Sequence, residues 1–477
     1  MSNGLKTKLR KHQRDNLAFH LEHERSGDWS EMGTGKTLTA LAKIVAWKRA
    51  GVIDRTLVVC PASVMPVWDR EVRIHTTLTP QVLVGSLDQK IELLKKFADI
   101  YIVTYDSLAG RKTTYAKLMS AIMAKGFDFI IGDEVAPYVK GKDALRTRAF
   151  TILCDEIPYA QFLAGYLIGN DPTQVFTIYR ALDKHIYGAN FFASRNKFFM
   201  DVGGYFPKWE MKASMKEEFM KRLFSVAVRS LKRDCLDLPP KIWSERYFEL
   251  TKEQKEFYIP IAEELVKQLE VEEGKINVPN ALTKMAKLSQ ITSGFIYTDR
   301  DTYTFYENPK IDLLKEILDP MVIEGEKLII YYKYQQSREL IKTLLDQLKI
   351  KFVALSEDPA MRGANLDRFR DDPNCLVFVA SVAAGGYGLT LTSSHVITYF
   401  DLDFKIIDYA QSQDRIHRIG QNKTCLYLPL LCQGGIDEYI YAMLNSKLDV
   451  ADSIMNSAYR QRLIDRLKGG LHVRSDD

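Results

Sequence analysis

The sequence predicts an α/β fold in which parallel strands alternate with helices. Three short runs in the first half are almost continuously apolar, as in strands buried on both faces: Thr56–Cys60, Ile100–Val103 and Phe127–Ile131. Between such runs apolar residues recur at helical spacing, for example from Leu38 to Trp47. A glycine-rich loop directly precedes that helix. Together these features predict a doubly wound sheet, which binds ligands at the carboxyl ends of its strands.

Length and composition argue against several classes of protein. A chain of 477 residues predicts two or three domains, and 46% hydrophobic with 27% charged residues is typical of a globular protein. The six cysteines include no Cys-x-x-Cys pair, which disfavours a zinc ribbon or a disulfide framework. The sequence has no apolar run of membrane-spanning length and no signal-peptide core, so we expect a cytoplasmic protein without membrane association. The net charge of +5 is mild, so DNA binding would require a local cluster of basic residues.

The glycine-rich loop, residues 30–37, ends in Gly-Lys-Thr and resembles a phosphate-binding loop. In such a loop backbone N–H groups surround the phosphates, the lysine reaches the β and γ oxygens, and the hydroxyl holds Mg²⁺. Lys36 and Thr37 stand at those two positions. Ser30 occupies the place of the first glycine of the pattern, so the match is incomplete. A chance Gly-Lys-Thr tripeptide is the alternative interpretation.

Polar residues follow the predicted strands where a nucleotide site requires them. Ser63 and Thr104 each follow a strand, and Asp133-Glu134 follows a third. One carboxylate of such a pair can hold Mg²⁺ and the other can orient the attacking water, although Asp-Glu after a strand is also a common turn. Upstream of the loop, the Gln13 amide both donates and accepts and so could read adenine, with a surface glutamine as the alternative.

The middle of the chain has a different character. Residues 180–300 are rich in aromatic and basic side chains, which we interpret mainly as core, and a helix is expected from Met220 to Val228. Leu238-Pro239-Pro240-Lys241 is a stiff break and predicts a domain boundary. Thr251 with Gln254 predicts a capped helix start.

A second α/β unit begins near Lys310. Its expected strands are Lys327–Tyr332, Phe352–Leu355, Leu376–Ala380 and Val396–Phe400. The glycine-rich turn 381–388 could bring backbone close to a phosphate. Further on, Arg415 and Arg418 would share one face of a helix, and two guanidinium groups suit a γ-phosphate, with a solvated charged face as the alternative. His417 is expected to be structural.

The order of these motifs resembles the superfamily 2 helicases, and more narrowly the Swi/Snf-type double-stranded DNA translocases. The most specific string is Gln-Ser-Gln-Asp-Arg-Ile-His-Arg-Ile-Gly-Gln at residues 411–421. Supporting strings lie at residues 31–37, 59–68, 238–241 and 385–392. The resemblance covers roughly residues 5–450 and fits a compact bacterial or phage-like member, a minimal motor without an appended reader domain. Position 30 is often not glycine in that family.

The resemblance implies an α/β fold of two RecA-like lobes, parallel sheets with flanking helices, and helical protrusions. It implies four parts: lobe 1 over 1–238 with a protrusion from about 180, a helical protrusion or linker over 239–305, lobe 2 over 306–450, and a helical tail over 451–477. It also implies a DNA-dependent ATP hydrolase that uses ATP and Mg²⁺ in the cleft between the lobes, acting as a monomer on double-stranded DNA.

The resemblance also implies which residues catalyse hydrolysis and which bind metal, nucleotide and DNA. Glu134 would activate water, and Arg415 and Arg418 would act as arginine fingers. Thr37 and Asp133 would hold Mg²⁺. The nucleotide-binding positions would be Gln13, Met32, Gly33, Thr34, Gly35, Lys36, Thr37, Gly386, Gly388 and Gln411. The DNA phosphate track would comprise Ser63, Thr104, Tyr105 and Ser381.

Two departures from the family pattern concern coupling. Val135-Ala136 follows Asp133-Glu134, where the family has a small residue and then histidine. Ala164-Gly165-Tyr166-Leu167 stands where Thr-Gly-Thr-Pro is usual. The resemblance makes an ATP-dependent DNA translocase the leading hypothesis. The two departures motivate one alternative, a poorly coupled DNA-binding protein that retains the fold. The other alternative is a strand-separating DNA or RNA helicase.

Overall fold

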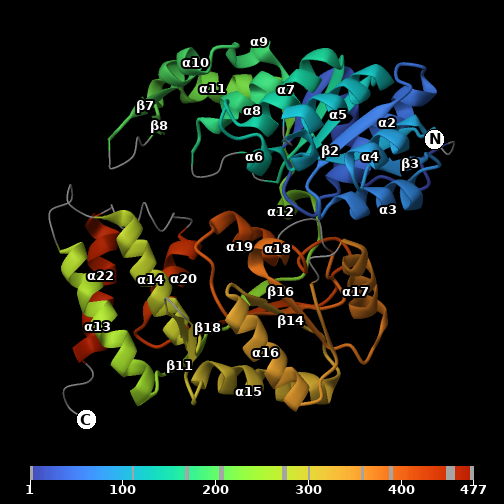
Figure 1. Cartoon of the computed structure of the whole chain (residues 1–477). Helices are drawn as coiled ribbons and strands as arrows, with labels where there is room; N and C mark the ends of the chain where they lie inside the picture. The colour runs from blue at the N-terminus through green and yellow to red at the C-terminus, as the bar shows by residue number, and fades with distance from the viewer. Residues whose placement is uncertain are drawn as a thin grey trace. The chain divides into compact units, whose positions relative to one another are not determined.

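The computed structural model shows two compact units, one reaching Asp237 and the other starting at Leu238 (Figure 1). Each unit is built on its own parallel sheet, and each is described by itself. The structure describes residues 4–109, 112–165, 167, 171–203, 209–270, 277–298, 301–355, 359–385, 390–446 and 457–472.

The sheet of the first unit is parallel throughout. Its strands, in spatial order, are β3 (Pro80–Val82), β4 (Ile100–Thr104), β2 (Thr56–Cys60), β5 (Phe129–Asp133), β6 (Tyr159–Leu163), β1 (Arg25–Asp28) and β9 (Ala227–Val228). In β2, Leu57 and Val59 belong to one core cluster, and Val58 and Cys60 belong to the other. Helices therefore cover both faces, as the continuously apolar strands predicted.

Helices connect these strands. They are α1 (Lys11–Glu22), α2 (Lys36–Arg49), α3 (Met65–His75), α4 (Leu87–Lys95), α5 (Lys112–Lys125), α6 (Val135–Tyr138), α7 (Leu145–Glu156), α8 (Gln174–Leu182), α9 (Lys184–Tyr187), α10 (Phe191–Phe198), α11 (Lys216–Leu223) and α12 (Lys232–Cys235). Short 3₁₀ turns lie at Asp106–Ala109 and Ala213–Met215, and β7 (Phe199–Asp201) pairs antiparallel with β8 (Trp209–Met211).

Two features of this unit differ from the sequence expectation. The helix expected from Met220 to Val228 ends at Leu223, because the chain then extends into β9 and pairs in parallel with β1. Strand β1 was not expected at all, since Arg-Ser-Gly-Asp has no apolar residue. Its burial comes from the neighbouring strands β6 and β9 rather than from its own composition.

The aromatic residues after position 175 form a cluster within the core of this unit. The ring of Phe176 lies 5.3 to 6.3 Å from five other aromatic rings. Phe198 and Phe199 are 1% exposed, which confirms their interpretation as core. Phe192 is different, because it is 52% exposed.

The second unit has a parallel sheet of the same kind. Its strands are, in order, β10 (Lys241–Trp243), β18 (Cys425–Cys432), β17 (Val396–Tyr399), β14 (Leu328–Tyr332), β16 (Val377–Ser381) and β15 (Phe352–Ala354), with β11 (Arg246–Phe248) also paired to β18. The four strands expected from sequence are present, with ends shifted by one residue.

The helices of the second unit complete the fold. They are α13 (Lys252–Leu269), α14 (Val278–Thr292), α15 (Pro309–Glu324), α16 (Gln335–Gln347), α17 (Pro359–Asp371), α18 (Val382–Gly385), α19 (Ile406–Gln413), α20 (Ile436–Asn445) and α22 (Ser457–His472). A hairpin joins β12 (Phe295–Tyr297) and β13 (Thr302–Thr304). The expected cap of α13 is confirmed: Thr251 Oγ1 accepts from Gln254 N at 3.2 Å. Among the described residues, no helix has both the length and the apolar content to cross a membrane.

Candidate nucleotide-binding site

The loop between β1 and α2 has the backbone of an anion-binding loop. Gly33 and Gly35 have φ values of 79° and 88°, a region that side chains other than glycine rarely adopt. A Cβ on Gly35 would overlap Nε2 of Gln13. The next residue, Lys36, begins α2, whose first N–H groups have no acceptor within the helix. This arrangement favours an anion above the loop.

Ser30, which replaces the first glycine of the pattern, has a structural role in this fold. Its Oγ accepts from the backbone N–H of Ser230 at 2.9 Å and from Nδ2 of Asn16 at 3.3 Å. The Oγ of Ser230 in turn donates to Oδ1 of Asn16 at 3.2 Å. Ser30 has no positive φ, so glycine is not required at this position. The serine joins the loop to α1 and to the segment that follows β9.

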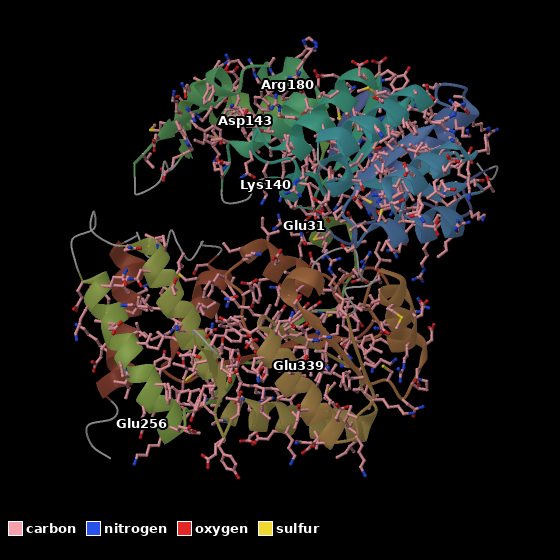
Figure 2. All side chains as sticks on the ribbon, in the orientation of Figure 1. Glu31, Lys140, Asp143, Arg180, Glu256 and Glu339 are labelled. Atoms are coloured by element: carbon pink, nitrogen blue, oxygen red, sulfur yellow. The ribbon has the colours of Figure 1, made fainter. Side chains whose placement is uncertain are left out.

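The lysine and glutamate of the loop are held by backbone groups. Lys36 Nζ donates to the carbonyl oxygens of Ser30 at 2.8 Å and Glu31 at 3.3 Å, so its ammonium lies over the loop. The carboxylate of Glu31, labelled in Figure 2, accepts from the backbone N–H of Lys232 at 2.7 Å. Thr34 Oγ1 donates to the Glu31 carbonyl at 2.8 Å. The loop is therefore pre-formed, with its cation already positioned.

Gln13 contacts the loop through its amide. Its Oε1 accepts from Arg10 N at 2.9 Å and its Nε2 donates to the carbonyl of Thr34 at 3.2 Å. The side chain is 3% exposed, so the alternative of a surface glutamine does not hold. These contacts fix the amide orientation and leave one N–H and one oxygen lone pair to meet a base edge.

Asp133 and Glu134 end the central strand β5. Trp68 Nε1 donates to Asp133 Oδ2 at 2.8 Å, and Glu134 N donates to Oδ1 at 3.0 Å. Burial, followed by the adjacent Glu134 carboxylate, raises the pKa of Asp133 to about 7 against the opposing effects of Trp68 and Lys36. Glu134 has a φ of 51°, unusual for a residue other than glycine, and is 8% exposed.

These residues fit a Mg²⁺-nucleotide. The buried Asp133 carboxyl, whose pKa is raised, is costly to ionise, and a nearby cation would relieve that cost. Asp133 is close enough to Lys36 for the ammonium to lower its pKa, so carboxylate and phosphate-loop lysine share one region. Thr37, on the first turn of α2, is the hydroxyl that could join Asp133 as a ligand.

The proposed DNA-facing residues of the first unit differ in accessibility. Ser63 is half-buried just after β2. Thr104 Oγ1 bonds with Ser107 Oγ at 2.8 Å and also accepts from Ser107 N at 3.0 Å. Tyr105 is fully buried, and its hydroxyl donates to the carbonyl oxygen of Asp133 at 3.0 Å. The Tyr105 side chain thus supports the carboxylate strand from behind.

The arginine motif of the second unit is not on one helix. Helix α19 ends at Gln413, and Arg415 and Arg418 lie in the turns that follow, so the expected shared helix face is absent. Arg415 is 3% exposed, and Arg418 is partly exposed. His417 Nε2 contacts the carbonyl of Pro239 at 2.9 Å, which confirms its structural role.

The other residues of the second unit that were expected to bind nucleotide or DNA differ in how far the structure describes them. Gln411 is 1% exposed on α19, and Ser381 ends β16 in a half-buried position. Gly386 and Gly388 lie outside the described residues.

Comparison with known proteins identifies the family. Residues 12–294, more than half of the chain, match the SNF2-related domain, and residues 309–420 match the helicase conserved C-terminal domain. The chain belongs to the SNF2-related family. This confirms the resemblance to Swi/Snf-type ATPases and the α/β fold of two RecA-like lobes.

Individual relatives of this SNF2-related chain are distant. An uncharacterized ATP-dependent helicase of Mycoplasma genitalium, MG018, is 24% identical over 94% of this chain and 42% of its own length. The human DNA annealing helicase and endonuclease ZRANB3 is 24% identical over 95% of this chain and 41% of its own length. The chain thus spans less than half of either relative. A solved structure, the Sulfolobus solfataricus SWI2/SNF2 ATPase core in complex with dsDNA, aligns at 21% identity and a TM-score of 0.44, covering 97% of this chain and 98% of that one.

One altered segment of this SNF2-related chain, Ala164-Gly165, packs against β1 and the nucleotide loop. Ala164 is fully buried, and its N–H donates to the carbonyl of Asp28 at 3.1 Å. A Cβ on Gly165 would overlap Cγ of Met32. Ala136 is 8% exposed beside the carboxylates. Tyr166 lies outside the described residues. The contacts between segment and loop thus persist through backbone and packing, without the hydroxyl groups that the family places there.

Sequence reasoning missed several supporting residues. Asp28 accepts from Ser30 N at 3.0 Å and lies 3.6 Å from Nε2 of buried His20, behind the loop. Trp68 was noted only as part of a motif, although its indole positions Asp133. A buried aspartate in a polar strand just before a phosphate loop is the signal that could have pointed to Asp28. The role of Ser230 has no local signal, because 200 residues separate it from Ser30.

Proposed function

We propose that this protein is an ATP-dependent translocase on double-stranded DNA. The observation that carries the proposal is that one unit of an SNF2-related chain holds both a pre-formed phosphate loop at Lys36 and the buried Asp133-Glu134 pair. The printed names of its relatives describe ATP-dependent helicases and DNA-acting proteins. These names and the site chemistry support hydrolysis of ATP with DNA as the partner.

In the proposed reaction each residue has one task. Lys36 and the first N–H groups of α2 bind the phosphates, and the Gln13 amide meets adenine. Mg²⁺, held by Thr37 and Asp133, would neutralise developing phosphate charge. Glu134 orients and deprotonates the attacking water. Arg415 and Arg418 would contribute guanidinium groups from the second unit, which requires the two units to meet around the nucleotide.

The experiment is phosphate release from ATP with and without duplex DNA. We expect low basal turnover and a DNA stimulation of at least about tenfold, the loss of which corresponds to about 1.4 kcal/mol of barrier. Duplex, single-stranded DNA and RNA are compared at one ionic strength, because charge contacts to phosphate depend on salt. An absence of stimulation by duplex DNA in an active preparation refutes the translocase.

Movement is tested separately from hydrolysis. A translocase displaces the third strand of a DNA triplex without opening a fork, whereas a strand-separating helicase opens the fork. Unwinding of a fork without triplex displacement would favour the helicase over the translocase.

A second candidate is a DNA-binding protein in which hydrolysis and movement are poorly coupled. Ala164 and Ala136 favour it, because neither side chain can make the hydrogen bonds of the residues usual at these family positions. In this case duplex DNA stimulates ATP hydrolysis but triplex displacement stays at the level without ATP. Restoring Ala164→Thr would then raise displacement per ATP hydrolysed.

The remaining proposals concern organisation. We propose lobe 1 over residues 1–238 with its protrusion, a helical segment over 239–305, lobe 2 over 306–450, and a helical tail over 451–477. The first boundary agrees with the division between Asp237 and Leu238. We further propose a monomer that works in the cytoplasm, for which size-exclusion chromatography with light scattering is the first measurement.

A further inference from the structure

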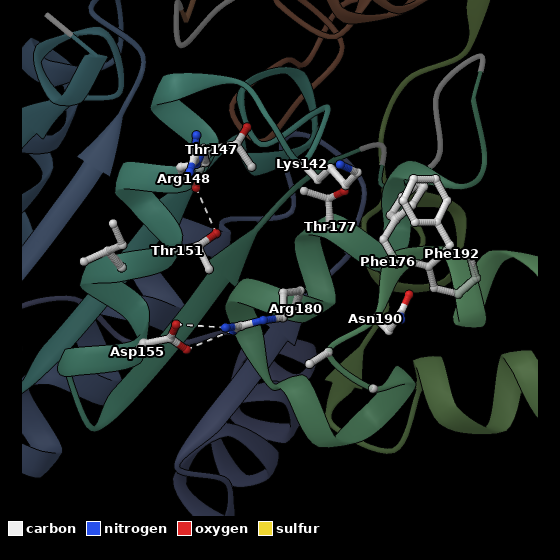
Figure 3. A pocket seen from close by; sticks show the side chains of 14 residues that line it. Lys142, Thr147, Arg148, Thr151, Asp155, Phe176, Thr177, Arg180, Asn190 and Phe192 are labelled. Carbon is white, nitrogen blue, oxygen red and sulfur yellow. Dashed lines mark hydrogen bonds and ion pairs between the residues drawn. The ribbon is translucent and has the colours of Figure 1, made fainter. Parts of the chain in front are cut away.

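The first unit contains a pocket that the proposed ATP reaction does not use. It lies between α7, α8 and the turn before α10, and has a volume of about 700 Å³ (Figure 3). Its residue Arg180 lies well away from Glu31 of the phosphate loop (Figure 2). Pockets of this size hold small ligands or a few peptide residues.

The pocket has a rigid floor and a small-residue lip. Phe176, part of the buried aromatic cluster, forms the floor at 3% exposure. Gly188, Ala189 and Asn190 form the lip, and Asn190 Oδ1 accepts from Ala193 N at 3.1 Å to cap α10. Opposite, Arg180 and Asp155 join α8 to α7 through two bonds of 2.9 and 3.0 Å, as Figure 3 shows. The walls are therefore fixed without a ligand.

One buried polar group in this pocket has no partner. Thr177, on α8 beside Phe176, is 5% exposed, and within the described part of the chain its Oγ1 has no hydrogen-bond partner. A buried hydroxyl without a partner costs roughly 1–3 kcal/mol. The other two threonines of the wall are satisfied, since Thr147 donates to the carbonyl of Lys140 and Thr151 to that of Thr147. The Thr177 hydroxyl is closed off from solvent, so it offers no hydrogen bond to the accessible part of the pocket.

The charge of the pocket favours an anion. Its lining carries Lys142, Arg148, Arg180 and one acid, Asp155. Arg180 is neutralised by Asp155, and Lys142 pairs at 2.6 Å with Asp143, which is itself highly exposed. Across the described residues Arg148 forms no ion pair, and its side chain is exposed. Arg148 is therefore the lining cation that a ligand can pair with directly, and Lys142 adds positive charge that Asp143 partly offsets.

The rim is apolar and extends beyond the pocket. Ile152 is 43% exposed and Phe192 is 52% exposed, and both line the pocket. Leu145, 60% exposed, lies two helical turns before Ile152 on the same side of α7. Lys142 Nζ lies 5.2 Å from the centre of the Phe192 ring, so cation and aromatic ring adjoin. An exposed aromatic ring beside a cation offers both an apolar and a charged contact to a partner chain.

We propose that this pocket binds a short acidic segment of a partner protein, with one apolar side chain seated against Phe176 and its carboxylates at Lys142 and Arg148. The extension of the apolar rim to Leu145 favours a peptide over a small anion. Duplex DNA fits less well, because DNA-backbone sites align many cations, whereas here two cations adjoin exposed apolar side chains. The proposal concerns recruitment and stands whether or not the ATP reaction is as proposed.

The test starts from a displayed library of random short peptides, selected against the full chain and counter-selected against the double variant Arg148→Glu/Ile152→Asp. We expect enriched sequences with Asp or Glu next to one Phe, Leu or Ile. A fluorescein-labelled copy of an enriched peptide then gives the affinity by anisotropy, with a short DNA duplex as competitor. Selection of sequences without acidic residues overturns the proposal.

Matched variants separate the pocket from general charge. Arg148→Glu should weaken the peptide at least about fivefold, because it turns an attraction into a repulsion. Lys315→Glu makes the same charge change at an exposed position of α15 in the second unit and should leave the affinity unchanged. Equal weakening by both variants would show that net charge alone drives binding and would refute the site.

Thr177→Val is a control for folding beneath the pocket. Valine keeps the shape and removes an unsatisfied hydroxyl, so the unfolding midpoint should stay the same or rise. Peptide affinity should be unchanged, because the hydroxyl is closed off from solvent. A loss of affinity as large as that of Arg148→Glu would refute the proposed position of the peptide. Full displacement of the peptide by duplex DNA, together with loss of DNA affinity in Arg148→Glu, would assign this surface to DNA instead.

Discussion

Ser30→Gly restores the glycine of the phosphate-loop pattern and should nevertheless damage the protein. The substitution removes the Oγ that accepts from Ser230 N at 2.9 Å and Asn16 Nδ2 at 3.3 Å. Each hydrogen bond contributes about 1 kcal/mol net, and a glycine in place of a side chain costs about 0.5–1 kcal/mol more. We expect the free energy of unfolding of the first unit to fall by about 2–3 kcal/mol.

Tryptophan fluorescence reports this unit selectively. Four of the five tryptophans belong to it: Trp29, Trp47, Trp68 and Trp209. A loss of about 2–3 kcal/mol in a unit of this size lowers the unfolding midpoint by about 5–10 °C. Ser30→Ala is the matched control, because it removes the hydroxyl without adding glycine flexibility, and should show roughly two thirds of the effect. ATP affinity should fall with both variants, since the loop loses an anchor.

The opposite result is informative. If Ser30→Gly leaves the midpoint within about 1 °C of the natural chain and binds ATP more tightly, then Ser30 is a defect in the loop, and the hydrogen bonds to Ser230 and Asn16 contribute no measurable stability.

Four further predictions concern the nucleotide site and the helix behind it. Glu134→Gln should abolish phosphate release while ATP binding, measured by equilibrium titration, persists; retained turnover would show that another group activates water. Since burial raises the pKa of Asp133 to about 7, its carboxyl favours the folded state most below pH 4, and that contribution is lost as pH rises toward 7. Asp133→Asn should therefore weaken the pH dependence of the unfolding midpoint between pH 5 and 8. In the natural chain, stabilisation by Mg²⁺-ATP should grow over the same range. An unchanged pH dependence in the variant would contradict this reasoning. Burial lowers the pKa of Lys43 to about 7, so the free energy of unfolding should rise between pH 7 and 10. Lys43→Met should remove that rise and increase the free energy of unfolding at pH 7, measured by urea titration, by about 1–3 kcal/mol. A destabilised variant would contradict this. Gly165→Ala should displace Met32 and raise the KM for ATP, and the added change Met32→Ala should restore it; a double variant no better than the single one would show that the overlap is not the cause.

Much of this fold could be predicted from local sequence. Strands β2, β4 and β5 are almost continuously apolar, because both faces are covered, and such runs are visible without any tertiary knowledge. The cap at Thr251 and the chemistry of Lys36 were equally local. Family membership also followed from motif order, because residues 411–421 are specific enough to be recognised in one sequence.

What could not be predicted depends on contacts between distant segments. The sequence of β1 is polar, and it becomes a buried strand only because β6 and β9 pair with it. Leu223 ends α11 for the same reason, since the edge of the sheet attracts the residues that follow. The partner of Ser30 is likewise fixed by the fold alone, and the pattern at residue 30 therefore resembled a missing glycine.

The contacts of the loop suggest where coupling could reside in this chain. Backbone N–H groups of Gly27, Trp29 and Glu31 donate in turn to the carbonyls of Val226, Val228 and Ser230, at 2.8, 2.9 and 3.0 Å. The Glu31 carboxylate then accepts from Lys232 N at the start of α12. This ladder joins the phosphate loop to the last segment of the first unit before Leu238. Any displacement of the loop from residues 226–230 would strain or relax that ladder, because hydrogen bonds of this length tolerate little displacement. The segment at Ala164, which lacks the family's threonines, therefore need not be the sole route by which the nucleotide state reaches the rest of the chain. Glu31→Gln weakens one rung of the ladder and distinguishes the two routes. If the ladder carries coupling, this variant should lower DNA stimulation of the ATPase without changing basal turnover.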